Sequence, residues 1–263
     1  AAERTERELG PIDVWINNAM VSMYSPFLRM TPEEFRHIVD VTFLGSAHGM
    51  RCALQRMMPR DRGVIIQVGS ALAFRSIPLQ SAYCSSKHAL QGLVESVRSE
   101  LIHERSKVWL SMVNLPALNT TQFLWTRNRM RHQVRPVGTI FQPEVAARAI
   151  LFATEKRRRE LMVGYTTVEA TLGEKLFPGW LDRHLARTGW DGALLPEPAA
   201  LHAPDNFWQP MRGDHGSHGQ FDAQARGFSL QLWLAERRRQ LLGALLLAAG
   251  AAALFGRRRW SFS

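Results

Sequence analysis

The stretch that decides the fold lies at residues 63–87 and reads GVIIQVGSALAFRSIPLQSAYCSSK. Its first part, residues 63–70, is mostly apolar and β-branched, which predicts a buried strand. From Tyr83 onward, apolar residues recur at helical spacing, which predicts an amphipathic helix over residues 83–104. A buried strand followed directly by such a helix is typical of the α/β class.

The same alternation continues on both sides of this stretch. We expect further strands at residues 12–17, 108–115 and 161–164, and further helices at residues 31–57 and 143–155. The second of these helices begins at Pro143, and the first at Thr31 and Pro32, which suit the cap and the first helical position. Alternating strands and helices imply parallel crossover connections, so we predict a Rossmann-like, doubly wound parallel sheet.

Three of the predicted strands end in residues that could form a site. These ends are residues 17–19, Ser70 and residues 115–116. Because parallel strands place their carboxyl ends at one edge of the sheet, where such folds bind ligands, we expect all three groups to lie together.

Tyr83 and Lys87 are four residues apart at the start of the predicted helix, so they share one face. An ammonium beside a phenol favours the phenolate and lowers the phenol pKa from about 10 towards neutrality. Ser70 ends the preceding strand, and its hydroxyl can bind the same substrate oxygen. Together the three residues predict a site for proton transfer coupled to hydride transfer.

These residues, taken with two other motifs, resemble the short-chain dehydrogenase/reductase family. Residues 83–87, YCSSK, match its YxxxK signature, and Ser70 lies thirteen positions upstream, where the family keeps a catalytic serine. Residues 17–20, NNAM, resemble its NNAG turn, and residues 114–117, NLPA, followed by Thr120, resemble its post-strand PG motif. The resemblance covers residues 1–164.

The resemblance implies an NAD- or NADP-dependent oxidoreductase that acts on a small-molecule alcohol or ketone. Tyr83 would be the general acid/base, Lys87 would lower its pKa and hold the nicotinamide ribose, and Ser70 would bind the reacting oxygen. Ser70 and Tyr83 are therefore the expected substrate-binding residues. The expected cofactor-binding residues are Asn17, Ala19, Tyr83, Lys87, Pro116 and Thr120.

The sequence departs from the family pattern in several places. Thr42 stands where the family has a catalytic asparagine, and Met20 and Ala117 replace glycines. The family's TGxxxGxG loop, which binds the pyrophosphate through backbone amides, does not occur in the sequence. We therefore expect a partial Rossmann-like sheet, truncated at the N-terminus and lacking the first strands. An alternative is an inactive remnant of the family or a membrane-bound interaction protein.

The formal net charge of +10 is concentrated in short basic runs, at residues 156–159, 237–239 and 257–259. The last two flank the wholly apolar or small residues 241–255, which predicts a C-terminal membrane anchor rather than nucleic-acid binding. A buried helix or a helix joining subunits is the alternative. We accordingly expect a membrane-associated protein with its catalytic part in the cytoplasm, a lipophilic substrate and a homo-oligomer.

The chain therefore divides into a catalytic part at residues 1–165, an irregular extension packed on it at residues 166–227, and a C-terminal helix at residues 228–263. The extension contains His215, His218, Asp214 and Asp222, but its Gly-rich setting favours a solvated loop over a metal site. Two cysteines are too few for a disulfide framework.

Overall fold

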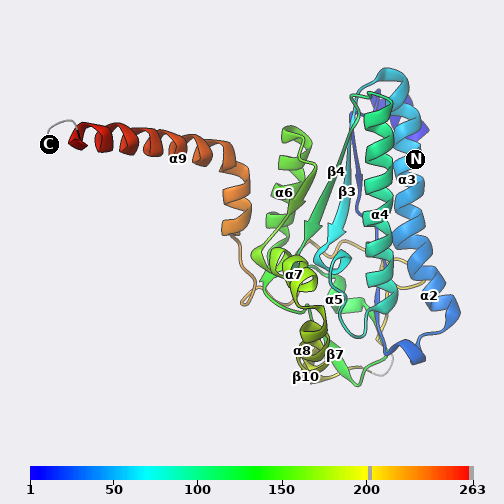
Figure 1. The fold of residues 1–263 in the computed structure, drawn as a ribbon. Helices are drawn as coiled ribbons and strands as arrows, with labels where there is room; N and C mark the ends of the chain where they lie inside the picture. The colour runs from blue at the N-terminus through cyan, green and yellow to red at the C-terminus, as the bar shows by residue number, and fades with distance from the viewer. Residues whose placement is uncertain (201–202, 261–263) are drawn as a thin grey trace.

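The computed structural model describes residues 1–200 and 203–260, with side chains up to residue 247. Within this part of the chain, the central sheet has four parallel strands in the order β1-β3-β4-β9 (Figure 1). The strands are β1 (Val14–Asn17), β3 (Val64–Ser70), β4 (Trp109–Leu115) and β9 (Glu160–Met162). Each falls on a predicted apolar run, and the predicted α/β class is confirmed.

Helices cover both faces of this sheet (Figure 1). Ile65 points into one apolar layer with Met57 and Leu90, while its neighbour Ile66 points into the other with Ala149. This opposition follows from the alternation of side chains along a strand. The first layer belongs to α3 (Gly45–Met57) and α4 (Ser81–His103), and the second to α6 (Pro143–Lys156). Two short helices, α1 (Ala2–Leu9) and α5 (Gln122–Trp125), lie outside these layers. Two short strand pairs also lie outside the central sheet: β2 (Met23–Tyr24) with β6 (Arg127–Asn128), and β5 (Ala117–Leu118) with β8 (Ile140–Phe141).

The helix expected at residues 31–57 is interrupted. It begins as α2 (Pro32–Val39), widens into a π-type turn at Asp40–Leu44 and continues as α3. Thr31 caps α2 in a reciprocal capping box, because its hydroxyl accepts from the Glu34 amide while the Glu34 carboxylate accepts from the Thr31 amide.

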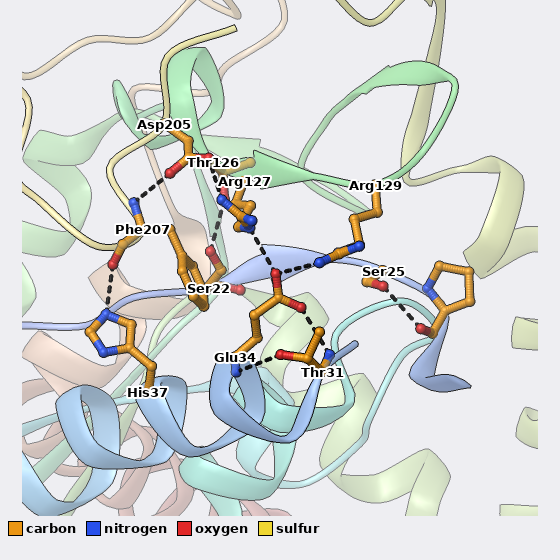
Figure 2. A network of polar contacts seen from close by, with 11 residues as sticks. Ser22, Ser25, Thr31, Glu34, His37, Thr126, Arg127, Arg129, Asp205 and Phe207 are labelled. Atoms are coloured by element: carbon orange, nitrogen blue, oxygen red, sulfur yellow. Dashed lines mark hydrogen bonds and ion pairs between the residues drawn. The ribbon is translucent and has the colours of Figure 1, made fainter. Parts of the chain in front are cut away.

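Glu34 also anchors a buried polar network between distant segments (Figure 2). Its Oε1 accepts hydrogen bonds from Arg127 at 2.9 Å and from Arg129 at 2.6 Å. Arg127 in turn binds Asp205, which lies in the C-terminal extension, at 2.9 Å. Burial alone would raise the pKa of Glu34, but Arg129, the Thr31 amide and Arg127 together outweigh it and hold that pKa below its usual range. The network therefore fastens the extension to α2.

The extension at residues 166–227 is more regular than expected. It contains α7 (Tyr165–Leu176), α8 (Pro178–Asp191) and β10 (Leu194–Pro198), which pairs antiparallel with β7 (His132–Val134). The prediction of an irregular segment is therefore wrong for its first half. Pro178 stands at the first position of α8, where proline favours helix initiation.

The final helix, α9 (Leu230–Trp260), packs on the body only through its first turns (Figure 1). Leu232 is buried against α6, and Arg148 forms an ion pair with Glu236 at 2.9 Å. Further along, α9 projects away from the sheet (Figure 1).

The predicted membrane anchor at residues 241–255 is contradicted. Among the described residues, none of the helices combines the length and the apolar character that a bilayer crossing requires. The apolar run itself has fifteen residues, whereas a spanning helix needs roughly 20. Residues 248–255 lie beyond the described side chains.

His218 connects the extension to α6 and should make that contact depend on pH. Its Nε2 lies 2.7 Å from Glu144 and its Nδ1 lies 2.8 Å from Asp222, so both ring nitrogens face carboxylate acceptors. Only the imidazolium can donate at both nitrogens. Hydrogen bonds to Glu144 and then to Asp222 raise the pKa of His218.

We therefore expect the docking of residues 214–222 to be strongest below the ordinary histidine pKa. It should weaken as the pH rises through the raised pKa of His218. The imidazolium then loses the proton that lets it donate to both carboxylates. Amide hydrogen-exchange protection factors, measured against pH, will report the change, and His218→Gln should remove its pH dependence. Equal protection at all pH values in the parent and the variant would show that His218 does not control the contact.

Candidate active site

The carboxyl ends of the strands open into a cavity of about 690 Å³. It is lined by residues of the strands β2 to β5, of the helices α4 to α6, of their connecting loops and of the extension, and these include Ser70, Tyr83, Lys87, Pro116 and Thr120. These five residues were expected from the sequence, and the structure brings them together. The volume is typical of sites for small molecules and cofactors.

Ser70 and Tyr83 both lie in the cavity wall. Ser70 is the last residue of β3, and its Oγ accepts a hydrogen bond from the Leu72 amide at 3.1 Å. Burial raises the pKa of Tyr83 above its ordinary value, and a hydrogen bond with Ser70 acts in the opposite direction without offsetting it. The expectation that the pKa of this phenol falls towards neutrality is therefore wrong, and the phenol is protonated at neutral pH.

Lys87 is buried beneath the tyrosine, with 3% of its surface exposed. Its Nζ lies 5.6 Å from the centroid of the Tyr83 ring and donates a hydrogen bond to the Val68 carbonyl at 2.9 Å. Burial lowers the pKa of Lys87 to about 8. An ammonium has three donors, so two remain for hydroxyl groups of a ligand in the cavity.

Asn17 and Ala19 do not line the cavity, although both were expected to bind the cofactor. Asn17 turns towards α3, where its side chain accepts from Trp15 at 2.7 Å and donates to the Ser46 carbonyl at 3.2 Å. A Cβ at Gly49 would lie 2.3 Å from Asn17 Oδ1, so glycine permits this close approach. Asn17 therefore joins the sheet to α3.

Asn18 and Met20 line the cavity in place of Asn17 and Ala19. The sequence held a signal for this exchange, because alternate residues of an extended segment point to opposite sides. If Asn17 packs against a helix, Asn18 and Met20 face the other way.

Several further residues of the cavity wall were not expected from the sequence. They lie outside the predicted strand ends and motifs, and they are Tyr24, Arg75, Ile77, Phe123, Trp125, Leu181 and Leu185. The last two belong to α8, whose position depends on tertiary packing.

Thr42, which replaces the family's asparagine, is fully buried and is not part of the cavity wall. Its Oγ1 accepts from the Val21 amide at 3.2 Å and donates to the Val21 carbonyl at 3.0 Å. Thr42 thereby fixes the backbone directly after Met20, one of the residues that lines the cavity.

Replacing Thr42 by Val should destabilise the protein by about 1–3 kcal/mol, because it leaves the buried amide and carbonyl of Val21 without partners. Valine has nearly the same shape, so the loss reflects hydrogen bonding. Urea denaturation measures it, with the exposed Thr5→Val as control, for which we expect a change within about 0.5 kcal/mol. Equal stabilities of the two variants would remove this role from Thr42.

Comparison with known proteins identifies the family of the chain. The family model described as short chain dehydrogenase matches residues 1–132, which is half of the sequence. The chain belongs to the short-chain dehydrogenase/reductase family. A solved short-chain dehydrogenase from Streptomyces avermitilis shares the fold, with a TM-score of 0.55, 24% identity and coverage of 72% of this chain and 73% of that one.

Two curated proteins illustrate what the chain is similar to. The uncharacterized oxidoreductase YxnA of Bacillus subtilis (strain 168) is 32% identical over 69% of this chain and 52% of its own length. Human L-xylulose reductase is 29% identical over 60% of this chain and 66% of its own length. The chain thus spans between half and two thirds of the length of these relatives.

Proposed function

We propose that this short-chain dehydrogenase/reductase is an NAD(P)-dependent oxidoreductase that interconverts a ketone and an alcohol in the 690 Å³ cavity. The observation that carries the proposal is the convergence of Ser70, Tyr83 and Lys87 on one cavity at the carboxyl edge of the sheet. Membership of the family supports the same reaction class.

The cavity fits the nicotinamide-ribose end of the dinucleotide. Lys87 offers two unused ammonium donors, which suit ribose hydroxyls, and Pro116 and Thr120 lie in the same cavity wall. Asn18 and Met20 extend this wall on the β1 side. The proposal covers both NAD and NADP.

In the reducing direction, Ser70 and Tyr83 would hold the carbonyl oxygen of the substrate between their two hydroxyl groups. A reduced nicotinamide dinucleotide, when bound, would supply the hydride for the carbonyl carbon. Tyr83 then gives its phenolic proton to the oxygen, and an alcohol results. The raised pKa of Tyr83 keeps the phenol protonated at neutral pH, which suits a proton donor.

Lys87 would stabilise the phenolate that remains after this transfer. Its ammonium lies 5.6 Å from the Tyr83 ring centroid in a buried setting, where the attraction between opposite charges is weakly screened. In the oxidising direction the same phenolate would accept the proton of the alcohol.

The proposal is tested by assaying the protein with a panel of ketones, in the presence of NADH or NADPH. We expect ketone-dependent oxidation of at least one of the two cofactors. The control is Tyr165→Phe, which alters a half-exposed tyrosine outside this cavity and should retain the parental rate. Absence of turnover with both cofactors, in a folded protein, would favour a non-catalytic relative of the family.

A further inference from the structure

The C-terminal extension forms part of the cavity that contains Tyr83. Leu181 and Leu185 of α8 contribute to its wall, as do Thr166 and Ala170 of α7. On α8, Leu181, Leu185 and Gly189 are spaced four residues apart and therefore share one face of the helix. This face turns inward, since both leucines are partly buried and Gly189 is buried.

An ion-pair latch holds this helix to the segment that follows the catalytic strand. Arg75, five residues after Ser70, donates to Glu174 of α7 at 2.6 Å and to Asp182 of α8 at 2.7 Å. The arginine side chain is only 14% exposed, and each carboxylate pairs with a different nitrogen of its guanidinium group. One residue thus connects the serine strand to both helices of the extension.

Close packing fixes α8 on the same segment. A Cβ at Gly189 would lie 3.2 Å from Pro78 Cδ, so glycine allows α8 to approach the loop more closely than another residue would. Near the start of α8, a Cβ added at Gly173 of α7 would lie 3.2 Å from Leu181. The absence of a side chain at Gly173 therefore lets the two helices pack closely.

The part of the wall that α8 completes is mostly apolar. Among the described residues, the charged members of the whole cavity wall are Lys87, which lies beside Tyr83, and Arg75. The apolar members of the part that α8 completes include Leu72, Ile77, Phe123, Val137, Leu181 and Leu185. Arg75 lies in the same wall, but two carboxylates already neutralise it. An anionic group of a substrate would gain little binding free energy in this part of the cavity. An alkyl or ring group would gain more, because it would be removed from water and would contact leucine and phenylalanine side chains.

We propose that α8 is a specificity lid, latched by Arg75, and that the substrate carries an extended apolar group packed on Leu181 and Leu185. The inference of a ketone or alcohol rests on the proposed function. The assignment of the apolar group rests on the cavity wall and can be tested by binding alone.

Isothermal titration calorimetry with a homologous series of methyl ketones provides this test without turnover. For the parent, we expect the affinity to rise about fourfold with each added methylene until the cavity is filled. In the double variant Leu181→Asn/Leu185→Asn, the gain should fall below about twofold per methylene. Leu172→Asn, on the exposed side of α7, is the matched control and should keep the parental dependence.

Arg75→Gln tests the latch while it leaves the apolar wall intact. We expect the longest ketones to bind about tenfold more weakly, because the lid loses its anchor, and the shortest to bind as in the parent. Arg148→Gln removes a comparable ion pair from the α6–α9 contact and should have no effect. Should the double variant fail to fold, Arg75→Gln alone decides the question.

The outcomes separate this inference from the proposed function. A chain-length dependence that disappears in the variants supports the lid even if no ketone is turned over. The lid proposal would be overturned if the affinity did not change with the length of the ketone's alkyl chain, or changed equally in the parent and the variants. Turnover in the same experiments would leave the oxidoreductase proposal standing.

Discussion

Tyr83→Phe is expected to lower kcat/KM for ketone reduction about a thousandfold, within the range that a positioned proton donor contributes. This loss corresponds to about 4 kcal/mol of transition-state stabilisation. The substitution removes the phenolic oxygen, and with it the proton that the carbonyl oxygen needs. Steady-state kinetics with the best ketone of the panel measures the effect.

Tyr165→Phe is the matched control, because it removes a phenolic hydroxyl that bonds Thr139 rather than a residue of the cavity. It should keep kcat/KM within about twofold of the parent, as is usual for substitutions away from the chemistry. If Tyr83→Phe retains more than about a tenth of the parental kcat/KM, another group donates the proton.

Lys87→Met should make the protein more stable and less active at the same time. Moving the pKa of Lys87 from its ordinary 10.5 to about 8 costs roughly 3 kcal/mol of folding free energy at neutral pH. Methionine removes this cost but also the hydrogen bond to the Val68 carbonyl, worth about 1 kcal/mol. We therefore expect a net gain of about 2 kcal/mol, together with a loss of activity of at least about a hundredfold.

The stability difference between the parent and Lys87→Met should depend on pH with a definite sign. Between about pH 8 and 10.5 the unfolded parent binds more protons than the folded parent, so the parent gains stability as the pH rises. The advantage of the variant is therefore full below pH 8 and disappears towards pH 10.5. Chemical denaturation at several pH values measures it.

Lys175→Met, on the exposed side of α7, is the control for Lys87→Met and should change neither stability nor activity beyond experimental error. A Lys87→Met variant that is less stable than the parent at neutral pH would show that the buried ammonium does not carry the expected cost.

Local patterns were sufficient to predict the framework of the fold. The runs that became β3 and β4 are apolar on both faces, as strands between two helical layers must be. Thr31 and Pro32 mark the start of α2 because the first amides of a helix need an acceptor such as the threonine hydroxyl. Strand ends also located Ser70 correctly at the edge of the cavity.

The parts that were not predicted depend on contacts between distant segments. Asn17 turns away from the cavity because Trp15 and Ser46 satisfy its amide group. Alternation along the segment separates Asn17 from Asn18, but which of the two faces the cavity depends on these contacts. The pKa of Tyr83 rises because burial outweighs the hydrogen bond from Ser70, and burial follows from tertiary structure. The place of α8 beside the cavity depends on Arg75, about a hundred residues earlier in the chain.

The most direct test of the central claim is isotope transfer at the cavity. The protein is incubated with a ketone and a reduced nicotinamide dinucleotide that carries deuterium at the transferred position. The alcohol is then analysed by mass spectrometry. We expect deuterium at the carbinol carbon with the parent and with Tyr165→Phe, and only background incorporation with Tyr83→Phe. An alcohol without deuterium from the parent, or equal incorporation with Tyr83→Phe, would contradict hydride transfer coupled to protonation by Tyr83.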